Sequence, residues 1–203
     1  MKKNENLRIE YKIITLGDSG VGKTSILKRY IHNKFEEENM STIGLSLAFK
    51  EITLKNNSKI ILKLIDTAGQ ERYRALTRTY YKNADGALFV FAHDDKESFE
   101  HIENWKHLFE ENNDSTKIPI FLIGNKNDQP KFNKEDSFDD FIKENNITKY
   151  ISTSAKDNIN IDIIFEEMAE IINSKRRKKS EKQNIKKLKP NKSECVSCNK
   201  AFQ

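Results

Sequence analysis

The fold is decided by Gly17-Asp18-Ser19-Gly20-Val21-Gly22-Lys23-Thr24. This stretch fits G-x-x-x-x-G-K-[ST], a pattern in which glycines let the backbone fold around phosphate groups with its N–H groups pointing inward. An apolar run rich in β-branched residues precedes it at Tyr11–Leu16, and a helical pattern follows at Ser25–Ile31. Because the motif needs a strand before it and a helix after it, the sequence favours a phosphate-binding loop over a chance glycine-rich turn.

This loop supplies the first set of predicted ligands. Its backbone N–H groups and the positive N-terminus of the following helix should hold phosphates. We expect Lys23 to place its charge against the β- and γ-phosphates, which also gives it a catalytic role, and the Thr24 hydroxyl to ligate Mg²⁺. The nucleotide-binding residues predicted for this segment are Ser19, Gly20, Val21, Gly22, Lys23, Thr24 and Ser25.

A second motif, Asp66-Thr67-Ala68-Gly69-Gln70, follows the strand predicted at Lys59–Ile65. An acidic residue at a strand end is well placed to hold Mg²⁺, usually through water, and Asp66 is that residue. Gly69 permits close approach to a γ-phosphate, and Gln70 can orient an attacking water and is the predicted catalytic residue. Isolated D-x-x-G tetrapeptides are common, so the weight of this one comes from its place one hairpin downstream of the phosphate loop. Thr42 is the remaining candidate magnesium ligand.

Two further motifs indicate a purine pocket. Asn125-Lys126-Asn127-Asp128 follows the strand predicted at Ile118–Ile123, and Ser154-Ala155-Lys156 follows a brief strand at Tyr150-Ile151. The Asp128 carboxylate can accept hydrogen bonds from N1–H and N2–H₂ of guanine, a pattern that adenine lacks. Lys126 can cover the purine plane, and the backbone of the second motif can donate to guanine O6. Each motif is weak alone, but four in this order, each after a strand, are specific.

Strand and helix patterns alternate, which predicts an α/β domain with a mostly parallel sheet and helices on both faces. Leu45–Leu54 and Lys59–Ile65 flank the turn-like Asn56-Asn57-Ser58 and should form a hairpin, which gives a six-stranded sheet one antiparallel edge strand. The other expected elements are a strand at Ala87–Phe91 and helices at Glu97–Glu111, Lys134–Asn145 and Asn158–Ile172.

The charge of the chain is divided unevenly. Residues 175–203 hold eleven of the 36 Lys and Arg and two of the 31 Asp and Glu, a net charge of +9, which leaves −4 for residues 1–174. We therefore expect one folded domain over 1–174 and a disordered basic tail over 175–203. Because the body is not basic, no nucleic-acid partner is predicted. Neither a signal peptide nor a run of 18 apolar residues is present, so a cytoplasmic protein is expected.

Taken together, these motifs resemble those of the Rab family of Ras-superfamily small GTPases, over about residues 8–172. The resemblance implies the small G domain of the P-loop NTPases, with GTP or GDP and Mg²⁺ as ligands. It implies that Phe35 edges the guanine, and that Thr42 and Gly69 hold the γ-phosphate and release it on hydrolysis. The Rab-like stretches are Ser41–Gly44, Asp66–Arg74, Tyr80-Tyr81, Lys96–Phe99, Gly124–Asp128 and Thr153–Lys156.

The resemblance also implies partners and a cellular role. An exchange factor, a GTPase-activating protein and effectors would bind the two switch regions, at about 34–46 and 68–80. Slow, Mg²⁺-dependent GTP hydrolysis in vesicle trafficking, at the cytosolic face of an endomembrane, is the leading hypothesis. A GTP-binding recruitment module with little or no hydrolysis is the alternative.

Several positions depart from the family pattern. Leu47 and Ile65 stand where Phe and Trp of an aromatic triad are usual, whereas Tyr80 is retained, so effector choice should differ. Cys195 and Cys198 are followed by five further residues, and no C-a-a-X terminus is present. Three interpretations of the tail stay open: a solvated segment with free thiols, a membrane contact made by the basic residues and one lipid, or half of a zinc site shared with a second chain.

Overall fold

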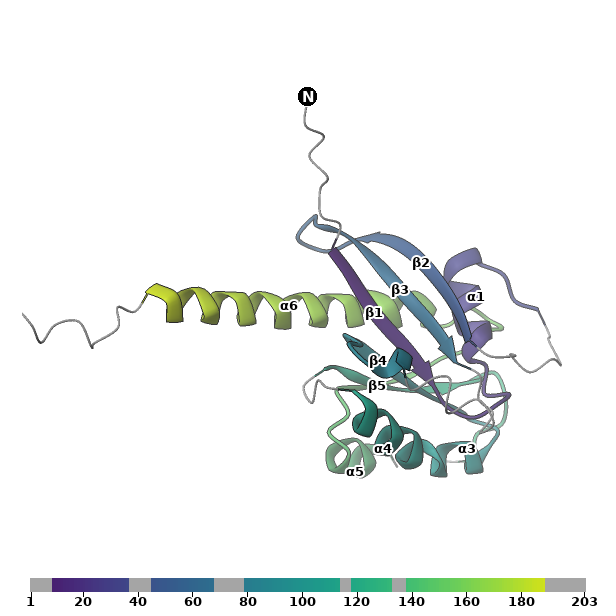
Figure 1. Cartoon of the computed structure of the whole chain (residues 1–203). Helices are drawn as coiled ribbons and strands as arrows, with labels where there is room; N and C mark the ends of the chain where they lie inside the picture. Colours follow the sequence, from purple (N-terminus) through teal and green to yellow (C-terminus); the bar gives the residue numbers. More distant parts are fainter. Residues whose placement is uncertain (1–8, 37–44, 68–78, 114–117, 133–137, 189–203) are drawn as a thin grey trace, which may run out of the picture. The chain divides into compact units, whose positions relative to one another are not determined.

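The structure is a computed structural model, and it describes residues 9–36, 45–67, 79–113, 118–132 and 138–188, with side chains up to Glu181 (Figure 1). Two units of the chain are distinguished, Met1–Ile172 and Asn173–Gln203. Within the described ranges, none of the helices has the length and apolar character needed to cross a bilayer.

The first unit is built on a six-stranded sheet of order β2-β3-β1-β4-β5-β6. All neighbouring strands are parallel except β2 and β3, which form an antiparallel hairpin at one edge, as the sequence predicted. The turn of the hairpin is closed by hydrogen bonds between Leu54 and Ser58 (2.9 Å) and between Asn57 and Leu54 (2.8 Å). The strands are β1 (Ile9–Leu16), β2 (Leu45–Thr53), β3 (Lys59–Thr67), β4 (Gly86–Ala92), β5 (Ile120–Asn125) and β6 (Lys149–Ser152).

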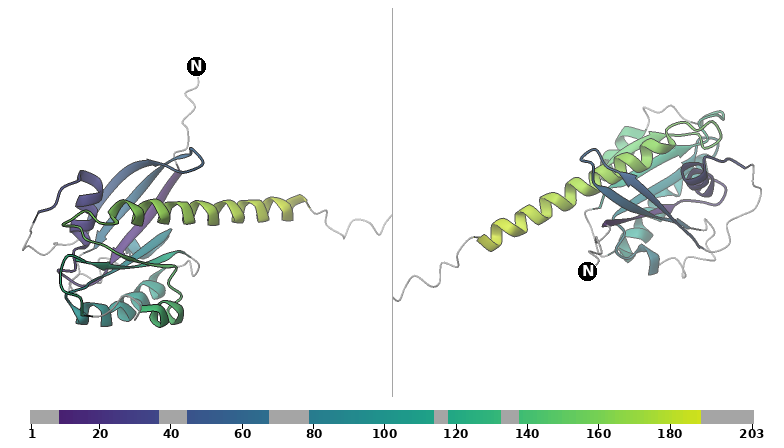
Figure 2. Two further views of the ribbon diagram at one scale, coloured as in Figure 1. Left: turned by 180° about the vertical axis from the view of Figure 1, so that it is seen from behind. Right: turned by 90° about the horizontal axis from the view of Figure 1, so that it is seen from above.

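Helices cover both faces of this sheet because each central strand is apolar on both sides. On β1, for example, Ile13 belongs to one buried cluster and Ile14 to the other. One cluster is completed by α1 (Lys23–His32) and the first turns of α6 (Ile161–Leu188). The other is completed by α4 (Ile102–Asn112) and by aromatic residues of the α5 region (Asp139–Glu144), and α3 (Lys96–Glu100) lies on the same side (Figure 2).

Two predicted helices are shorter or divided in the structure. The helix predicted at Glu97–Glu111 consists of α3 and α4, which meet at His101. Asp95 is the N-cap residue of α3. Its side chain accepts a hydrogen bond from the backbone N–H of Ser98 (3.2 Å). The helix predicted at Lys134–Asn145 lies partly outside the described residues, which resume at residue 138. In the described part, α5 runs from Asp139 to Glu144.

The final helix is longer than predicted. It was expected to end at Ile172, but α6 continues to Leu188, so the expectation of disorder is wrong for residues 175–188. Lys, Arg, Glu and Gln form helices readily, and extending an existing helix costs far less than starting one. Residues 189–203, including Cys195 and Cys198, lie outside the described residues. The division into a 1–174 domain and a tail stays a prediction.

Candidate functional site

The phosphate loop connects β1 to α1 at the carboxyl end of the parallel strands. Gly22 has φ 95°, in the left-handed region, and a Cβ there would lie 2.2 Å from Nδ2 of Asn125. Gly17 has φ 145°, and a Cβ there would lie 2.1 Å from the carbonyl oxygen of Val90. Both positions therefore require glycine, which explains why the motif has it there.

Lys23, the first residue of α1, is hydrogen-bonded to the phosphate loop through its side chain. Its Nζ donates to the carbonyl oxygens of Gly17 (3.0 Å) and Asp18 (2.7 Å), and the residue is only 5% exposed. Burial lowers the pKa of the Lys23 ammonium to about 8, against the opposing charges of Asp66 and Asp18. A phosphate anion next to Nζ would favour the charged form again, so the site suits an anionic ligand.

The proposed metal ligands Thr24 and Asp66 meet across the start of α1 and the end of β3. The Thr24 hydroxyl donates to Oδ2 of Asp66 (2.6 Å), while Oδ1 of Asp66 is buried and has no hydrogen-bond partner among the described residues. Burial raises the pKa of the Asp66 carboxyl, although the Thr24 hydrogen bond and Lys23 oppose this. A carboxylate oxygen and a hydroxyl are ligands that Mg²⁺ accepts, and a cation or its water would satisfy Oδ1, so these residues fit a magnesium ion.

The two predicted base-binding motifs are joined by hydrogen bonds. The Ser154 hydroxyl donates to Oδ1 of Asp128 (2.6 Å), and Gln129 donates to Oδ2 (3.0 Å). Burial opposes ionisation of Asp128, but these hydrogen bonds outweigh it and lower the pKa of its carboxyl. Asn125 connects both motifs to the phosphate loop, because it donates to the Val21 carbonyl (2.8 Å) and accepts from the N–H of Ala155 (3.3 Å).

Arg29 on α1, which belongs to none of the predicted motifs, is hydrogen-bonded to the second base motif. It donates from Nε to the Ala155 carbonyl (2.9 Å) and from Nη2 to the Lys156 carbonyl (2.9 Å). Its guanidinium carbon also lies 5.9 Å from the centroid of the Phe35 ring. Arg29 thereby links the second base motif to the residue expected to edge the guanine. No short motif contains it, since its partners lie more than 120 residues away.

Comparison with known proteins agrees with this geometry. The sequence profile of the Ras family matches residues 12–174. The chain is 41% identical over 157 residues to Ras-related protein Rab-32 of Sus scrofa, covering 75% of this chain and 70% of that protein. The chain is a Rab-type member of the Ras family. It is also 40% identical over 170 residues to Ras-related protein Rab-11B of Dictyostelium discoideum (81% and 76% covered) and 41% identical over 158 residues to GTP-binding protein ypt3 of Schizosaccharomyces pombe (77% and 72% covered).

Family membership fixes the general properties. Ras-family proteins in general bind GTP or GDP with Mg²⁺ and are GTPases, and Rab proteins have regulators and effectors. Of the site residues predicted for this Rab-type protein, the structure describes Ser19–Ser25, Phe35, Asp66, Asn125, Lys126, Asp128 and Ser154–Lys156. Lys126 has φ 61°, and its Nζ lies 3.3 Å from Oδ2 of Asp94. Thr42, Gly69 and Gln70 lie outside the described residues.

The predicted effector surface of this Rab-type protein is only partly described, because residues 37–44 and 68–78 are not. Leu47 and Tyr80 are 44% and 41% exposed, as a docking surface needs. Ile65 pairs with Leu47 across the hairpin but is completely buried and belongs to a core cluster. Of the two substituted triad positions, Leu47 is therefore exposed and Ile65 is part of the core.

Proposed function

We propose that this protein is a GTP-hydrolysing switch that cycles between GDP and GTP states and acts in vesicle trafficking. The observation that carries the proposal is the arrangement of Lys23, Thr24 and Asp66 at the phosphate loop, a buried cation beside a hydroxyl–carboxylate pair that fits Mg²⁺. The paired Asp128 and Ser154 support guanine as the base. Rab relatives at about 40% identity support trafficking as the process.

The chemistry requires positioning and charge neutralisation more than covalent catalysis. Lys23 would hold the β- and γ-phosphates, and the N-terminus of α1 would add its partial positive charge. Mg²⁺, when bound by Thr24, Asp66 and the proposed ligand Thr42, supplies further charge neutralisation. Gln70 would orient the attacking water. The matched motifs contain no arginine finger, so intrinsic hydrolysis should be slow, on the order of 10⁻⁴–10⁻³ s⁻¹.

Single-turnover hydrolysis by the Gln70→Leu variant tests the catalytic assignment. Leucine cannot orient water, so we expect hydrolysis of bound GTP to slow by roughly tenfold or more, since misplacing a reactant is costly, while the affinity for GDP stays unchanged. Filter assays on protein preloaded with GTP measure the rate. Equal rates for the wild type and Gln70→Leu would refute the catalytic role given to Gln70, and the absence of hydrolysis by both proteins would favour the recruitment module, the alternative function.

We further propose that the basic segment after Asn173 contacts an anionic membrane surface. Support comes from the ten basic residues between Lys175 and Lys192, of which Lys175–Lys179 are exposed on a helix. Each could contribute about 1 kcal/mol near an anionic leaflet. This attraction would act from the cytosolic side of an endomembrane.

Vesicle sedimentation of the full chain tests this contact. We expect binding to vesicles containing phosphatidylserine, with the bound fraction falling as salt rises. Replacing residues 175–179 by Gln should weaken binding by at least about tenfold, because five charges are removed. Binding of the variant equal to that of the wild type would contradict the proposal. The intact mass of protein from its own cells shows whether Cys195 or Cys198 also carries a lipid.

A further inference from the structure

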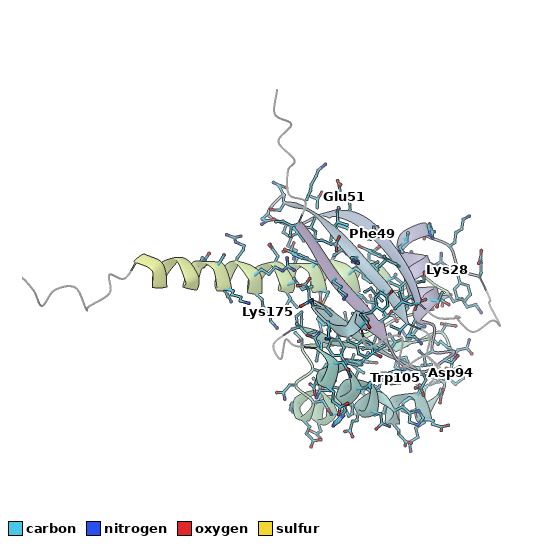
Figure 3. The ribbon with its side chains drawn as sticks, in the orientation of Figure 1. Lys28, Phe49, Glu51, Asp94, Trp105 and Lys175 are labelled. Atoms are coloured by element: carbon cyan, nitrogen blue, oxygen red, sulfur yellow. The ribbon has the colours of Figure 1, made fainter. Side chains whose placement is uncertain are left out.

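One residue of the phosphate loop is held from outside the loop. The two carboxylate oxygens of Asp18 each accept a hydrogen bond from the helical layer on one face of the sheet. Nε1 of Trp105 donates to Oδ1 (2.6 Å), and Nδ1 of His101 lies 2.6 Å from Oδ2. Figure 3 shows Trp105 close to the carboxyl end of β1, where the loop begins.

These two donors differ in chemistry. Trp105 is 4% exposed, belongs to a buried apolar cluster and cannot titrate in the physiological range. His101 lies at the junction of α3 and α4, and its side chain is 41% exposed. One oxygen of Asp18 is therefore held by a fixed donor, and the other by a donor whose charge depends on pH.

The backbone of Asp18 carries this restraint into the binding site. Its carbonyl oxygen accepts the hydrogen bond from Nζ of Lys23 (2.7 Å), next to the bond that Lys23 makes with Gly17. A change in the backbone conformation of Asp18 that moved its carboxylate away from His101 would also displace this carbonyl group. The conformation of the phosphate loop and the position of Lys23 are therefore coupled to the α3–α4 junction.

We propose that His101 is a positioning residue for the phosphate loop, which it holds through Asp18, and that its protonation slows release of the bound nucleotide. The proposal rests on the proposed function, since it requires a nucleotide in the loop. An imidazolium adds an ion pair to its hydrogen bond with the Asp18 carboxylate, whereas a neutral imidazole makes the hydrogen bond alone. Release should therefore be slower at low pH than at high pH.

The charges that face His101 act in the same direction. Nε2 of His101 lies 3.9 Å from Glu97 on α3, and Asp95 at the start of α3, Glu100 on α3 and Asp18 on the loop also interact with it electrostatically. The hydrogen bond to Asp18 raises the pKa of His101, partial burial lowers it, and the three carboxylates Asp18, Glu97 and Asp95 raise it. Because the pKa is raised, the additional restraint is complete below the ordinary value of about 6.5 and is lost as pH rises through the raised pKa.

The test is the rate of release of a fluorescent GDP analogue from the full chain between pH 5.5 and 8.5. For the wild type we expect the rate to rise roughly twofold to fivefold across this range, the effect of one partly exposed charge pair. For His101→Asn we expect a flat profile at the fast, high-pH rate. His107→Asn is the matched control, because His107 lies on α4 with a side chain 77% exposed and paired with Glu111; it should follow the wild type.

Parallel profiles for the wild type and His101→Asn would overturn the inference. A measurement on the unsubstituted protein tests the inference independently of how the variant folds. In an NMR titration of the GDP complex, the pKa of His101 should lie above about 6.5, and a pKa at or below 6.5 would also overturn the inference. Failure of the proposed function has a different signature, the absence of saturable GDP binding by the wild type at every pH.

Discussion

Replacing Asp128 by Asn should change the base preference of the protein from guanine to xanthine. In the proposed role the carboxylate would accept two hydrogen bonds from guanine, at N1–H and N2–H₂. An amide could accept only one of them, and its NH₂ donor would face the other. Xanthine carries an oxygen in place of N2–H₂, so that donor finds an acceptor. A hydrogen bond to a charged group contributes about 1.5–3 kcal/mol, so the loss of one of the two should lower GDP affinity roughly 10–10²-fold.

The contact between Asp128 and the second base motif can survive this substitution. The hydrogen bond from the Ser154 hydroxyl to Oδ1 (2.6 Å) can be kept by the amide oxygen of Asn, so the two base motifs should stay together. Competition of GDP and XDP against a fluorescent nucleotide measures the preference. Asp140→Asn provides the matched control, because the Asp140 side chain is 93% exposed on α5 and should leave it unchanged. An unchanged preference for GDP in Asp128→Asn would refute the role given to Asp128.

Lys23→Met should remove most of the affinity for both GDP and GTP. The ammonium is buried, and burial lowers its pKa to about 8, so it gains strongly from an anion beside it. At about 1.5–3 kcal/mol for each charge-assisted contact, loss of the contact to the β-phosphate predicts an affinity for GDP roughly 10–10²-fold lower, and loss of the contacts to the β- and γ-phosphates predicts an affinity for GTP roughly 10²–10⁴-fold lower. Methionine keeps a similar apolar stem, so the packing around the loop should change little.

Titration calorimetry with GDP and Mg²⁺ checks this prediction, and thermal unfolding shows whether the variant is folded. Lys59→Met is the control, since Lys59 starts β3, its side chain is 73% exposed and it pairs with Glu51. Its affinity should match that of the wild type. A folded Lys23→Met protein that binds GDP as tightly as the Lys59 variant would show that Lys23 does not hold the phosphates.

The sequence by itself determined the fold class and most of the candidate site. Its motifs are contiguous because each predicted phosphate, metal or base contact belongs to a short loop after a strand. The residue types and spacing of such a loop can be recognised in a few consecutive residues. The hairpin edge and the order of strands and helices followed for the same reason: period-2 and period-3.6 patterns and turn residues are local signals. Family membership rests on these same stretches, which the match over residues 12–174 covers.

The tertiary structure decided which distant residues support the site. Arg29 contacts Ala155 and Lys156 only because α1 and the loop after β6 are brought together, and Asp18 contacts His101 and Trp105 only because α3 and α4 cover one face of the sheet. Burial also distinguishes two aliphatic residues that occupy equivalent positions in the predicted triad. Leu47 and Ile65 are paired across the hairpin, but Leu47 is 44% exposed and Ile65 is completely buried. Hydrogen bonds between residues more than 80 positions apart depend on how the helices and strands pack, and so does the burial of each side chain. No local sequence pattern encodes either of them.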